Sequence, residues 1–263
     1  MIRILLTCAL VIPTAAVAEP PENAIDAPEV AEELTEIAKR FLDAISENDK
    51  VNADYLFQDA ERFNMHFFPI ARRGAPLSDL TTGQRQLGYA LLSAALSHQG
   101  NQKALSIMSL GDYLRENDEQ PNEHRDSDRY YFTIFGKPEP EGTWGYRVEG
   151  FHLSINMTII DGRWISATPS FFGVIPATIP DGPLVGLQVL KNETLLARQL
   201  ANSLTDEQRE SGFGEIPEFL THTVGGLTTG NYRKIQRGEP DGLAAADMNE
   251  EQRALLMRLV REH

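Results

Sequence analysis

The chain has 263 residues, of which 41% are hydrophobic and 24% are charged. This composition is typical of a globular protein, and it excludes a collagen-like, disulfide-scaffold or wholly disordered chain. Asp and Glu number 38 against 24 for Lys and Arg, which leaves a formal net charge of −14. Because nucleic-acid binding depends on cations that neutralise phosphates, this charge argues against a nucleic-acid partner.

Residues 1–18 have the layout of a secretory signal peptide. Arg3 precedes an almost wholly apolar run, and Ala16-Val17-Ala18 provides a small-x-small cleavage sequence. The apolar run is shorter than the roughly 20 residues that span a bilayer, so we expect cleavage and no stable membrane insertion afterwards. These features predict a periplasmic or secreted protein. Cys8 is the only cysteine, so the mature chain can form neither a disulfide nor a thiolate metal site.

Residues 19–26 are expected to form a loose leader, and residues 27–263 a single domain that begins with a helix. Proline suits the first helical position, and Pro28 is followed by apolar residues at spacings of three and four, which predicts an amphipathic helix. Three later segments, beginning at Thr81, Thr205 and Asn249, place a capping residue three positions before a glutamine. Because the distances between these segments are unequal, we interpret them as three helix starts and not as a repeat.

The remaining helices follow from apolar periodicity. A helix from Thr82 to about Ser97 is expected to end at Gly100 as its C-cap, and a second from Gln102 to Arg115 would make an antiparallel pair with it. Helical periodicity resumes from Leu195 to Leu204. The last helix, about Glu250 to Arg261, is expected to bury four residues, namely Leu255, Leu256, Leu259 and Val260. Residues 225–242 are rich in Gly, Thr and Pro and are expected to form a long loop.

The middle of the chain changes to the period of β-strands. Residues 130–135 predict one strand, and residues 144–160 predict either one long strand or two strands bent at Gly150. Asp161-Gly162, between apolar runs, is a strong hairpin signal, and residues 163–168 would form the return strand. The sequence therefore predicts an α+β fold in which a central antiparallel sheet of hairpins is flanked by helices.

The second of these strand regions also carries the candidate site. If the strand is regular, one face holds the apolar positions and the other holds a polar row, which comprises His152, Ser154, Asn156 and Thr158. A solvated face explains such a row equally well. However, histidine can ligate a metal or move protons near neutral pH, and Arg147 and Glu149 flank the row. A bulge at Gly150 would bring these two charges onto the face of His152; without a bulge, they are expected to pair with each other or with a helix.

The same region resembles a known family. The stretches FGKP (residues 135–138), WGYRVEGFHLSIN (144–156) and TPSFFG (168–173) resemble the bacterial family called domain of unknown function 3500, as do residues 72–85, 91–100 and 242–253. The resemblance implies an exported protein, and it implies no activity that can be carried over. The family typically has two adjacent histidines after Glu-Gly, whereas here the first position is Phe151 and only His152 remains.

Two functional hypotheses follow. The first is an exported, metal-assisted hydrolase, with a divalent metal ion as its cofactor. His152 would be a metal ligand or general base, Glu149 a second ligand or acid/base group, and Arg147 an anion clamp. Ser154 or Asn156 would position the substrate.

The second hypothesis is a periplasmic protein without catalysis that binds a small molecule or a partner. The same strand face would bind a small polar ligand, and Trp144, Tyr146 and Phe171 would shape the pocket. The acidic charge favours a cationic or neutral ligand. Arg72 and Arg73 would hold an anion as paired guanidinium groups, although two loop arginines more often belong to a solvated surface.

Overall fold

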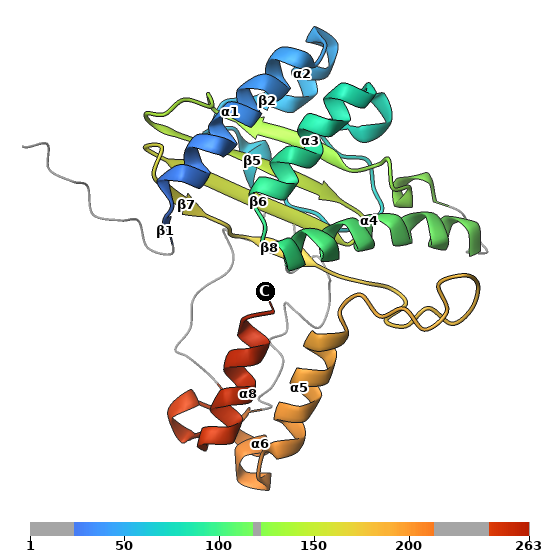
Figure 1. Cartoon of the computed structure of the whole chain (residues 1–263), viewed down its shortest axis with the longest axis vertical. Helices are drawn as coiled ribbons and strands as arrows, with labels where there is room; N and C mark the ends of the chain where they lie inside the picture. Colours follow the sequence, from blue (N-terminus) through green and yellow to red (C-terminus); the bar gives the residue numbers. More distant parts are fainter. Residues whose placement is uncertain (1–23, 118–121, 213–241, 263) are drawn as a thin grey trace, which may run out of the picture.

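The structure is a computed structural model, and it describes residues 24–117, 122–212 and 242–262. The expected signal peptide, most of the expected leader and nearly all of the expected loop at residues 225–242 lie outside these ranges. The main elements follow the order anticipated, with helices first, a block of strands in the middle and helices last (Figure 1); three two-residue strands, which the sequence did not indicate, lie before and among the first helices.

The helices of the described residues are α1 (Pro28–Ala44), α2 (Glu47–Ala53), α3 (Thr82–Ala94), α4 (His98–Asn117), α5 (Lys191–Ser203), α6 (Asp206–Gly212) and α8 (Glu250–Val260). Short 3₁₀ turns are η1 (Ala60–Phe63), η2 (Leu77–Asp79), η3 (Glu123–Arg125) and η6 (Ala245–Asp247). The strands are β1 (Ile25–Asp26), β2 (Asp54–Tyr55), β3 (Ala75–Pro76), β4 (Tyr131–Phe135), β5 (Thr143–Gly150), β6 (Leu153–Ile160), β7 (Trp164–Ser166) and β8 (Ser170–Phe172).

The strands form one eight-stranded sheet in the order β1-β7-β6-β5-β4-β2, with β3 paired to β4 and β8 paired to β6. Every pair is antiparallel except β2 with β4, which is parallel. The α+β prediction is therefore confirmed, with one parallel pair added at an edge. Asp161 and Gly162 have φ of 50° and 60° and connect β6 to β7, as the Asp-Gly signal predicts.

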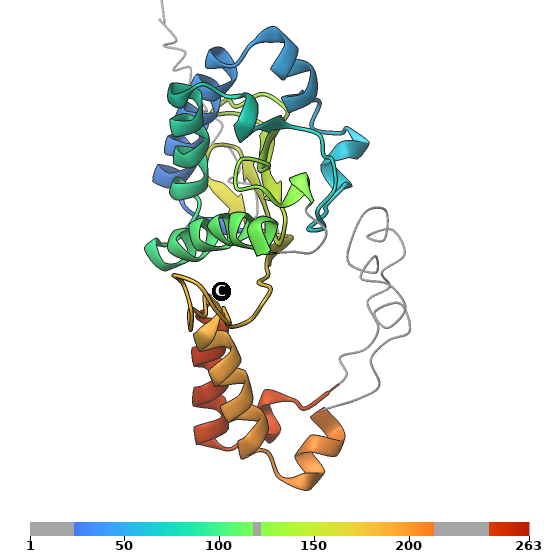
Figure 2. The same cartoon turned by 90° about the vertical axis from the view of Figure 1, so that its right-hand side faces the viewer.

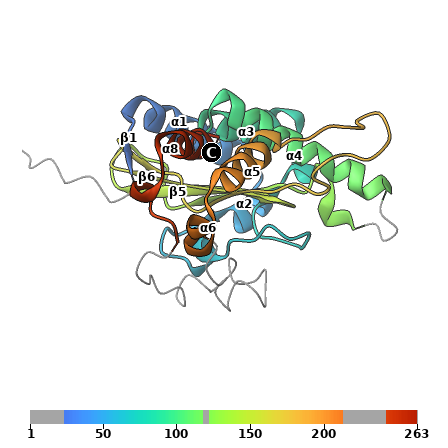
Figure 3. The same ribbon diagram turned by 90° about the horizontal axis from the view of Figure 1, so that it is seen from below.

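The core lies between the sheet and a layer made by α1, α3 and α4 (Figure 2). The apolar stripe of α1 faces the sheet, and its side chains Leu34, Ala38 and Phe41 are completely buried. The rings of Phe41 and Phe132 of β4 have centroids 5.8 Å apart. The opposite face of the sheet is covered by the irregular segment between β2 and β3 (Figure 3). Both faces of the central strands are thus shielded from water.

All three expected helix starts are present. Thr81 and Asn249 form complete capping boxes with Gln84 and Gln252, and the amide N–H of Gln208 donates to Thr205 Oγ1 at 3.2 Å. The expectation for Gly100 is wrong. Gly100 is not a C-cap, because α4 already begins at His98 and Gly100 lies in its first turn.

The helices α5, α6 and α8 project beyond the end of the sheet (Figures 1 and 2). The helices α5 and α8 pack against each other, and α8 does not cover the sheet. For this reason the expected burial of α8 is only partly correct: Leu255, Leu256 and Leu259 are half-buried, whereas Val260 is 56% exposed.

Candidate functional site

A two-residue turn between β5 and β6 decides which side chains meet at the predicted site. The register pairs Gly150 with Leu153, Glu149 with Ser154 and Arg147 with Asn156. Of the two alternatives, two strands bent at Gly150 is therefore correct and one long strand is wrong, and Gly150 is not a bulge. Because partners directly opposite each other share a face, Arg147 and Glu149 lie on the same face as Ser154 and Asn156, and His152 belongs to the turn.

Arg147 is completely buried and is held by the segment that covers this face. Its Nη1 donates to the backbone carbonyls of Glu61 and Asn64, each at 2.9 Å. Its Nη2 donates to Oε1 of Glu61 at 2.6 Å, and its Nε lies 3.3 Å from Oε1 of Glu149. A guanidinium group engaged on three sides in this way is not available as an anion clamp.

Glu149 occupies the centre of the same cluster. Its Oε2 accepts hydrogen bonds from the backbone N–H of His66 at 3.0 Å and from the Ser154 hydroxyl at 3.3 Å. Its Oε1 faces the Nε atoms of Arg147 and Arg72, at 3.3 and 3.5 Å. Burial raises the pKa of Glu149 above its usual value, and the two guanidinium groups together with these hydrogen bonds oppose that rise. We interpret the cluster as a structural ion network that fixes the covering segment to the sheet.

Arg72 and Arg73 do not form the pair of guanidinium groups that was considered for anion binding. The side chain of Arg72 is only 2% exposed, and it donates to the carbonyls of Ile70 and Gly150 at 2.9 and 3.0 Å. Arg73 is exposed and donates to Asn52 Oδ1 at 3.2 Å. The two side chains diverge because Arg72 is drawn toward Glu149 beneath the covering segment.

Two of the expected ligand-binding aromatic residues are core residues. Trp144 is completely buried and Tyr146 is 2% exposed. Both lie on the face of β5 that packs against the helices, and the Tyr146 hydroxyl donates to the carbonyl of Leu91 at 3.0 Å. Strand alternation places them opposite Arg147, so they cannot line a pocket with it. Phe171 stacks on Phe67 at a centroid distance of 3.9 Å.

The remaining polar positions are also occupied by contacts within the protein. Asn156 donates to the Ser154 hydroxyl at 3.2 Å and to the carbonyl of Pro169 at 2.8 Å. Thr158 lies further along β6, and its cross-strand partners are Gly145 and Ser166. The structure thus brings together four predicted site residues, Arg147, Glu149, Ser154 and Asn156. They pack against one another and the covering segment, and they do not line an open site.

His152 stands apart from this cluster, in the turn, with a left-handed φ of 61°. Its backbone N–H donates to Phe67 at 2.9 Å, and its carbonyl accepts from Gly173 at 2.8 Å. Its Nδ1 is buried without a hydrogen-bond partner, and the adjoining cavity, about 10 Å³, is barely large enough for one water. Within residues 24–117, 122–212 and 242–262, no group of three or more His, Cys, Asp or Glu residues is placed to hold a metal ion.

The environment of His152 predicts a measurable pH dependence. Burial lowers its pKa from 6.5 to about 4, and the positive charge of Arg125 adds to the effect. The unfolded state therefore binds more protons than the folded state between these two values, so the free energy of unfolding should fall as the pH is lowered through this window. An NMR titration of the imidazole should report the low pKa directly.

The variant His152→Asn isolates this contribution, because asparagine tolerates the left-handed conformation of the turn. Urea unfolding of both proteins should show that the wild type loses more stability than the variant between pH 6.5 and pH 4. The carboxylates titrate equally in both proteins and cancel in the difference. An imidazole that titrates near 6.5 would contradict the buried environment.

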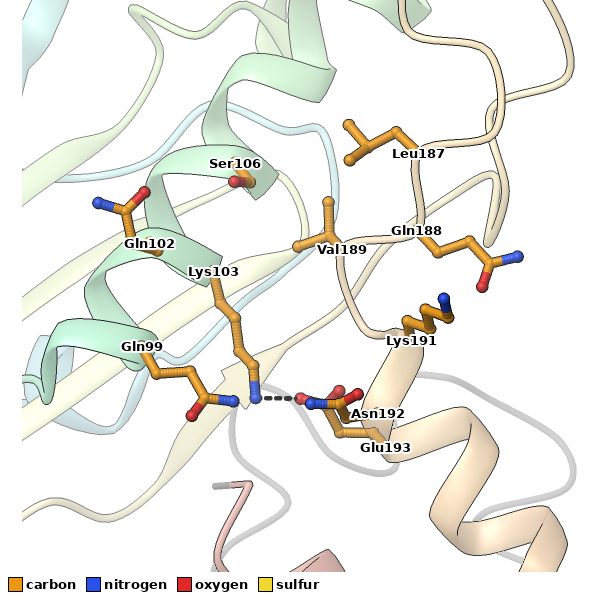
Figure 4. Close-up of a pocket in the computed structure, with 10 residues that line it drawn as sticks. All are labelled: Gln99, Gln102, Lys103, Ser106, Leu187, Gln188, Val189, Lys191, Asn192 and Glu193. Carbon is orange, nitrogen blue, oxygen red and sulfur yellow. Dashed lines mark ion pairs between the residues drawn. The ribbon is translucent and has the colours of Figure 1, made fainter.

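A pocket that the sequence did not indicate lies between α4 and residues 187–193 (Figure 4). Its volume is about 330 Å³, within the range of small-molecule sites. Its walls combine amide, hydroxyl and ammonium groups with two apolar side chains. The lining residues are Gln99, Gln102, Lys103, Ser106, Leu187, Gln188, Val189, Lys191, Asn192 and Glu193.

An ion network at the base of this pocket joins α4 to the ends of α5 and α8. Lys103 Nζ lies 2.6 Å from Glu193 Oε1 and 3.0 Å from Glu262 Oε2, and it also donates to the carbonyl of Glu262 at 2.7 Å. Oε2 of Glu193 is buried and accepts no hydrogen bond. The hydrogen bond from Lys103 lowers the pKa of Glu262. The one signal in the sequence is that Lys103, four residues before the buried Ile107, interrupts an apolar helix face.

These observations define an α+β protein with a mixed, largely antiparallel sheet, a buried ion network under one sheet face and an open polar pocket beside α4. The chain belongs to the family described as protein of unknown function (DUF3500), whose model matches residues 27–263. No curated protein and no solved structure matches the chain. In the described part of the chain, no helix is both long enough and apolar enough to cross a membrane.

Proposed function

We propose that this chain is an exported, non-catalytic binding protein that takes a small, neutral or cationic polar molecule in the pocket beside α4. The observation that carries this proposal is the pocket itself, whose lining includes the side chains of Gln102, Ser106 and Lys191, for which the described residues provide no hydrogen bond or ion pair (Figure 4). Such convergent polar groups in a concave site are the usual basis of small-molecule recognition.

The charge and hydrogen-bonding capacity of the pocket indicate the class of ligand. The free oxygen of Glu193 requires a donor, such as a hydroxyl or an ammonium group. Gln102 and Ser106 supply both donors and acceptors. The excess of acidic residues over the whole chain disfavours anions, nucleic acids included.

The metal-assisted hydrolase receives less support from the geometry. Glu149 and Arg147 are occupied by buried contacts, and His152 lies in a different part of the hairpin beside a very small cavity. General base catalysis requires that the base reach its substrate directly or through one water. The cavity beside His152 has room for one water but not for a substrate, and Glu149 is enclosed by its buried contacts.

The binding proposal is tested by a thermal-shift screen of the mature protein against sugars, polyols, amino acids and diamines. A ligand that raises the melting temperature is then titrated calorimetrically against Gln102→Ala. Since one hydrogen bond contributes about 1 kcal/mol, we expect affinity to fall about threefold to tenfold. Gln86→Ala, an exposed glutamine of α3 outside this pocket, is the control and should bind like the wild type.

The absence of catalysis and the export are tested separately. Mass spectrometry after incubation should recover the bound ligand unchanged, and a stoichiometric excess of product would identify an enzyme instead. Fractionation of cells that express the full chain should place the protein outside the cytoplasm. Its intact mass should be that of a chain that begins at Glu19. Retention of residues 1–18 in a cytoplasmic product would contradict the export proposal.

A further inference from the structure

The helices α5, α6 and α8 repeat the arrangement of α1, α2 and α3. After α1, two residues lead to the seven-residue helix α2, and after α5, two residues lead to the seven-residue helix α6. The third helix of each set packs against the first. We name residues 28–94 the first module, and residues 191–212 with 242–260 the second module.

The same hydrogen bonds hold both modules together. Gln84 Nε2 donates to the carbonyl of Ala44, the last residue of α1, at 2.7 Å. Gln252 Nε2 donates to the carbonyl of Ser203, the last residue of α5, at 2.7 Å. In each module the glutamine that closes the capping box therefore also ties the third helix to the end of the first.

Smaller details coincide as well. Thr35 Oγ1 donates to the carbonyl four residues earlier in the first module, and Thr194 Oγ1 does so in the second. Gly74 and Gly242, with φ of 113° and 101°, each stand three residues before a 3₁₀ turn, η2 or η6. A set of coincidences in one order along the chain is the mark of an internal repeat. The interpretation of the Thr81 and Asn249 segments as unrelated helix starts was therefore too narrow.

The first module packs against a strand outside it, β4. Its β2 pairs with Ile134 and Phe135 of β4, and its β3 pairs with Tyr131 and Phe132. Phe41 of α1 packs on the ring of Phe132, and a Cβ at Gly88 of α3 would lie 3.1 Å from that ring. The first module therefore contacts β4 in two ways. The strands β2 and β3 pair with one backbone edge of β4, and the helices α1 and α3 pack on one of its faces.

The second module carries the same apolar face, and no strand of the described residues packs against it. Leu91 and Leu92 of α3 are completely buried, whereas their counterparts in α8 are the half-buried Leu259 and the 56% exposed Val260. Ala38 of α1 is completely buried, whereas its counterpart Ala197 is exposed. Residues of α3 and α8 are paired by counting from Gln84 and Gln252. Residues of α1 and α5 are paired by counting from the last residues of these helices, Ala44 and Ser203.

The two modules differ at the end nearest α4. There the buried Leu34 and the half-buried Ala94 of the first module correspond to Glu193 and Glu262, which bind Lys103. At this end, the second module is bound to α4 through the ion pairs of Glu193 and Glu262 with Lys103. The face beyond this end, with Ala197, Leu200 and Val260, carries no charged group of its own.

We propose that the second module is an interaction surface for an extended β-strand of a partner polypeptide. The strand would resemble β4, with aromatic or branched side chains at alternate positions and no charge on the side that meets α5 and α8. The packing of the first module on β4 is the model for this contact. The face of the second module with Ala197, Leu200 and Val260 is uncharged, as is the apolar side of such a strand. In the first module, α1 and α3 pack on one face of β4 through Phe41 and Gly88, and α5 and α8 would make the same kind of contact with the partner strand. This inference goes beyond the proposed ligand pocket, which lies on the side of α4.

The probe is a synthetic peptide of residues 128–137, which contains β4, titrated against the intact mature chain by fluorescence anisotropy. We expect saturable binding that Val260→Asp weakens about tenfold or more, because an unpaired carboxylate would be buried against the peptide. Met257→Asp is the control: Met257 is 48% exposed on the same helix and corresponds to the outward Tyr89. It should leave binding unchanged.

Several outcomes are decisive. A peptide with Asp in place of Phe132 and Ile134 should not bind, and Ala197→Glu, on the neighbouring helix, should act as Val260→Asp does. Both positions are exposed, so an unchanged melting temperature is expected. No binding of the β4 peptide, or equal binding by the Val260→Asp variant, would overturn the proposal. A wild-type dimer that Val260→Asp converts to a monomer would identify a second copy of the chain as the occupant instead.

Discussion

Replacing Arg147 by alanine should destabilise the protein by about 3–5 kcal/mol, the usual cost of removing one partner from a buried ion pair. Arg147 is completely buried, and its loss removes one of the two guanidinium groups that face the Glu149 carboxylate and leaves the carbonyls of Glu61 and Asn64 without their donor. The measurement is the free energy of unfolding from urea titration at pH 7. Ligand binding in the pocket beside α4 should survive wherever the variant remains folded.

Arg163→Ala is the matched control. Arg163 pairs with Asp26 at the same 2.6 Å distance that Arg147 keeps from Glu61, but both partners in the control pair are more than 40% exposed. Exposed pairs contribute little, because water already solvates the separated charges. If the two variants lose similar stability, the ion network under the sheet is not a structural element.

Trp144→Ala should destabilise the protein by about 3–5 kcal/mol, the usual cost of removing a large aromatic side chain from a core. Trp144 is completely buried on the helix-facing side of β5, where its ring lies 6.1 Å from that of Tyr146. Its removal leaves a cavity between the sheet and the helix layer. The loss should appear in urea unfolding, while the affinity for a pocket ligand stays the same.

The only other tryptophan provides the comparison. Trp164 of β7 is half-buried and lies beneath the guanidinium group of Arg163, so Trp164→Ala should cost clearly less. The opposite pattern, in which Trp144→Ala keeps its stability and loses ligand affinity, would restore Trp144 to the binding role that the sequence first indicated.

The local elements were predictable because their signals are local. Proline at the first turn, the apolar stripe of α1, the capping boxes at Thr81 and Asn249 and the Asp161-Gly162 turn each depend on residues within a few positions of one another. The family was also recognisable from ordered motifs along the chain. The α+β class follows from the change of periodicity between these signals.

The turn at Phe151-His152 was missed for a physical reason. Tight two-residue turns usually contain Gly, Asn or Asp, because one residue adopts a positive φ. Here His152 takes that position at 61°, and histidine gives no such signal beside apolar residues. The missed turn inverted the predicted faces, since a shift of one residue exchanges the two sides of a strand. On one continuous strand, Arg147 and Glu149 would share the face of Phe151, whereas the turn places them with Ser154 and Asn156. Their pairing with each other, expected in the absence of a bulge, is confirmed.

The sequence by itself thus determined most of the helices, although not α2 or the start of α4, together with the hairpin at Asp161-Gly162 and the fold class, because these depend on short-range backbone preferences. It also determined the family, through ordered motifs along the chain. Only the tertiary structure decided that Arg147 and Glu149 are buried in an ion network, that Trp144 is a core residue and that Lys103 meets Glu193 and Glu262. It also decided that the apolar residues Ala197 of α5 and Val260 of α8 are exposed. Burial and ion pairing join residues far apart in the chain, and no local pattern encodes which of them will meet.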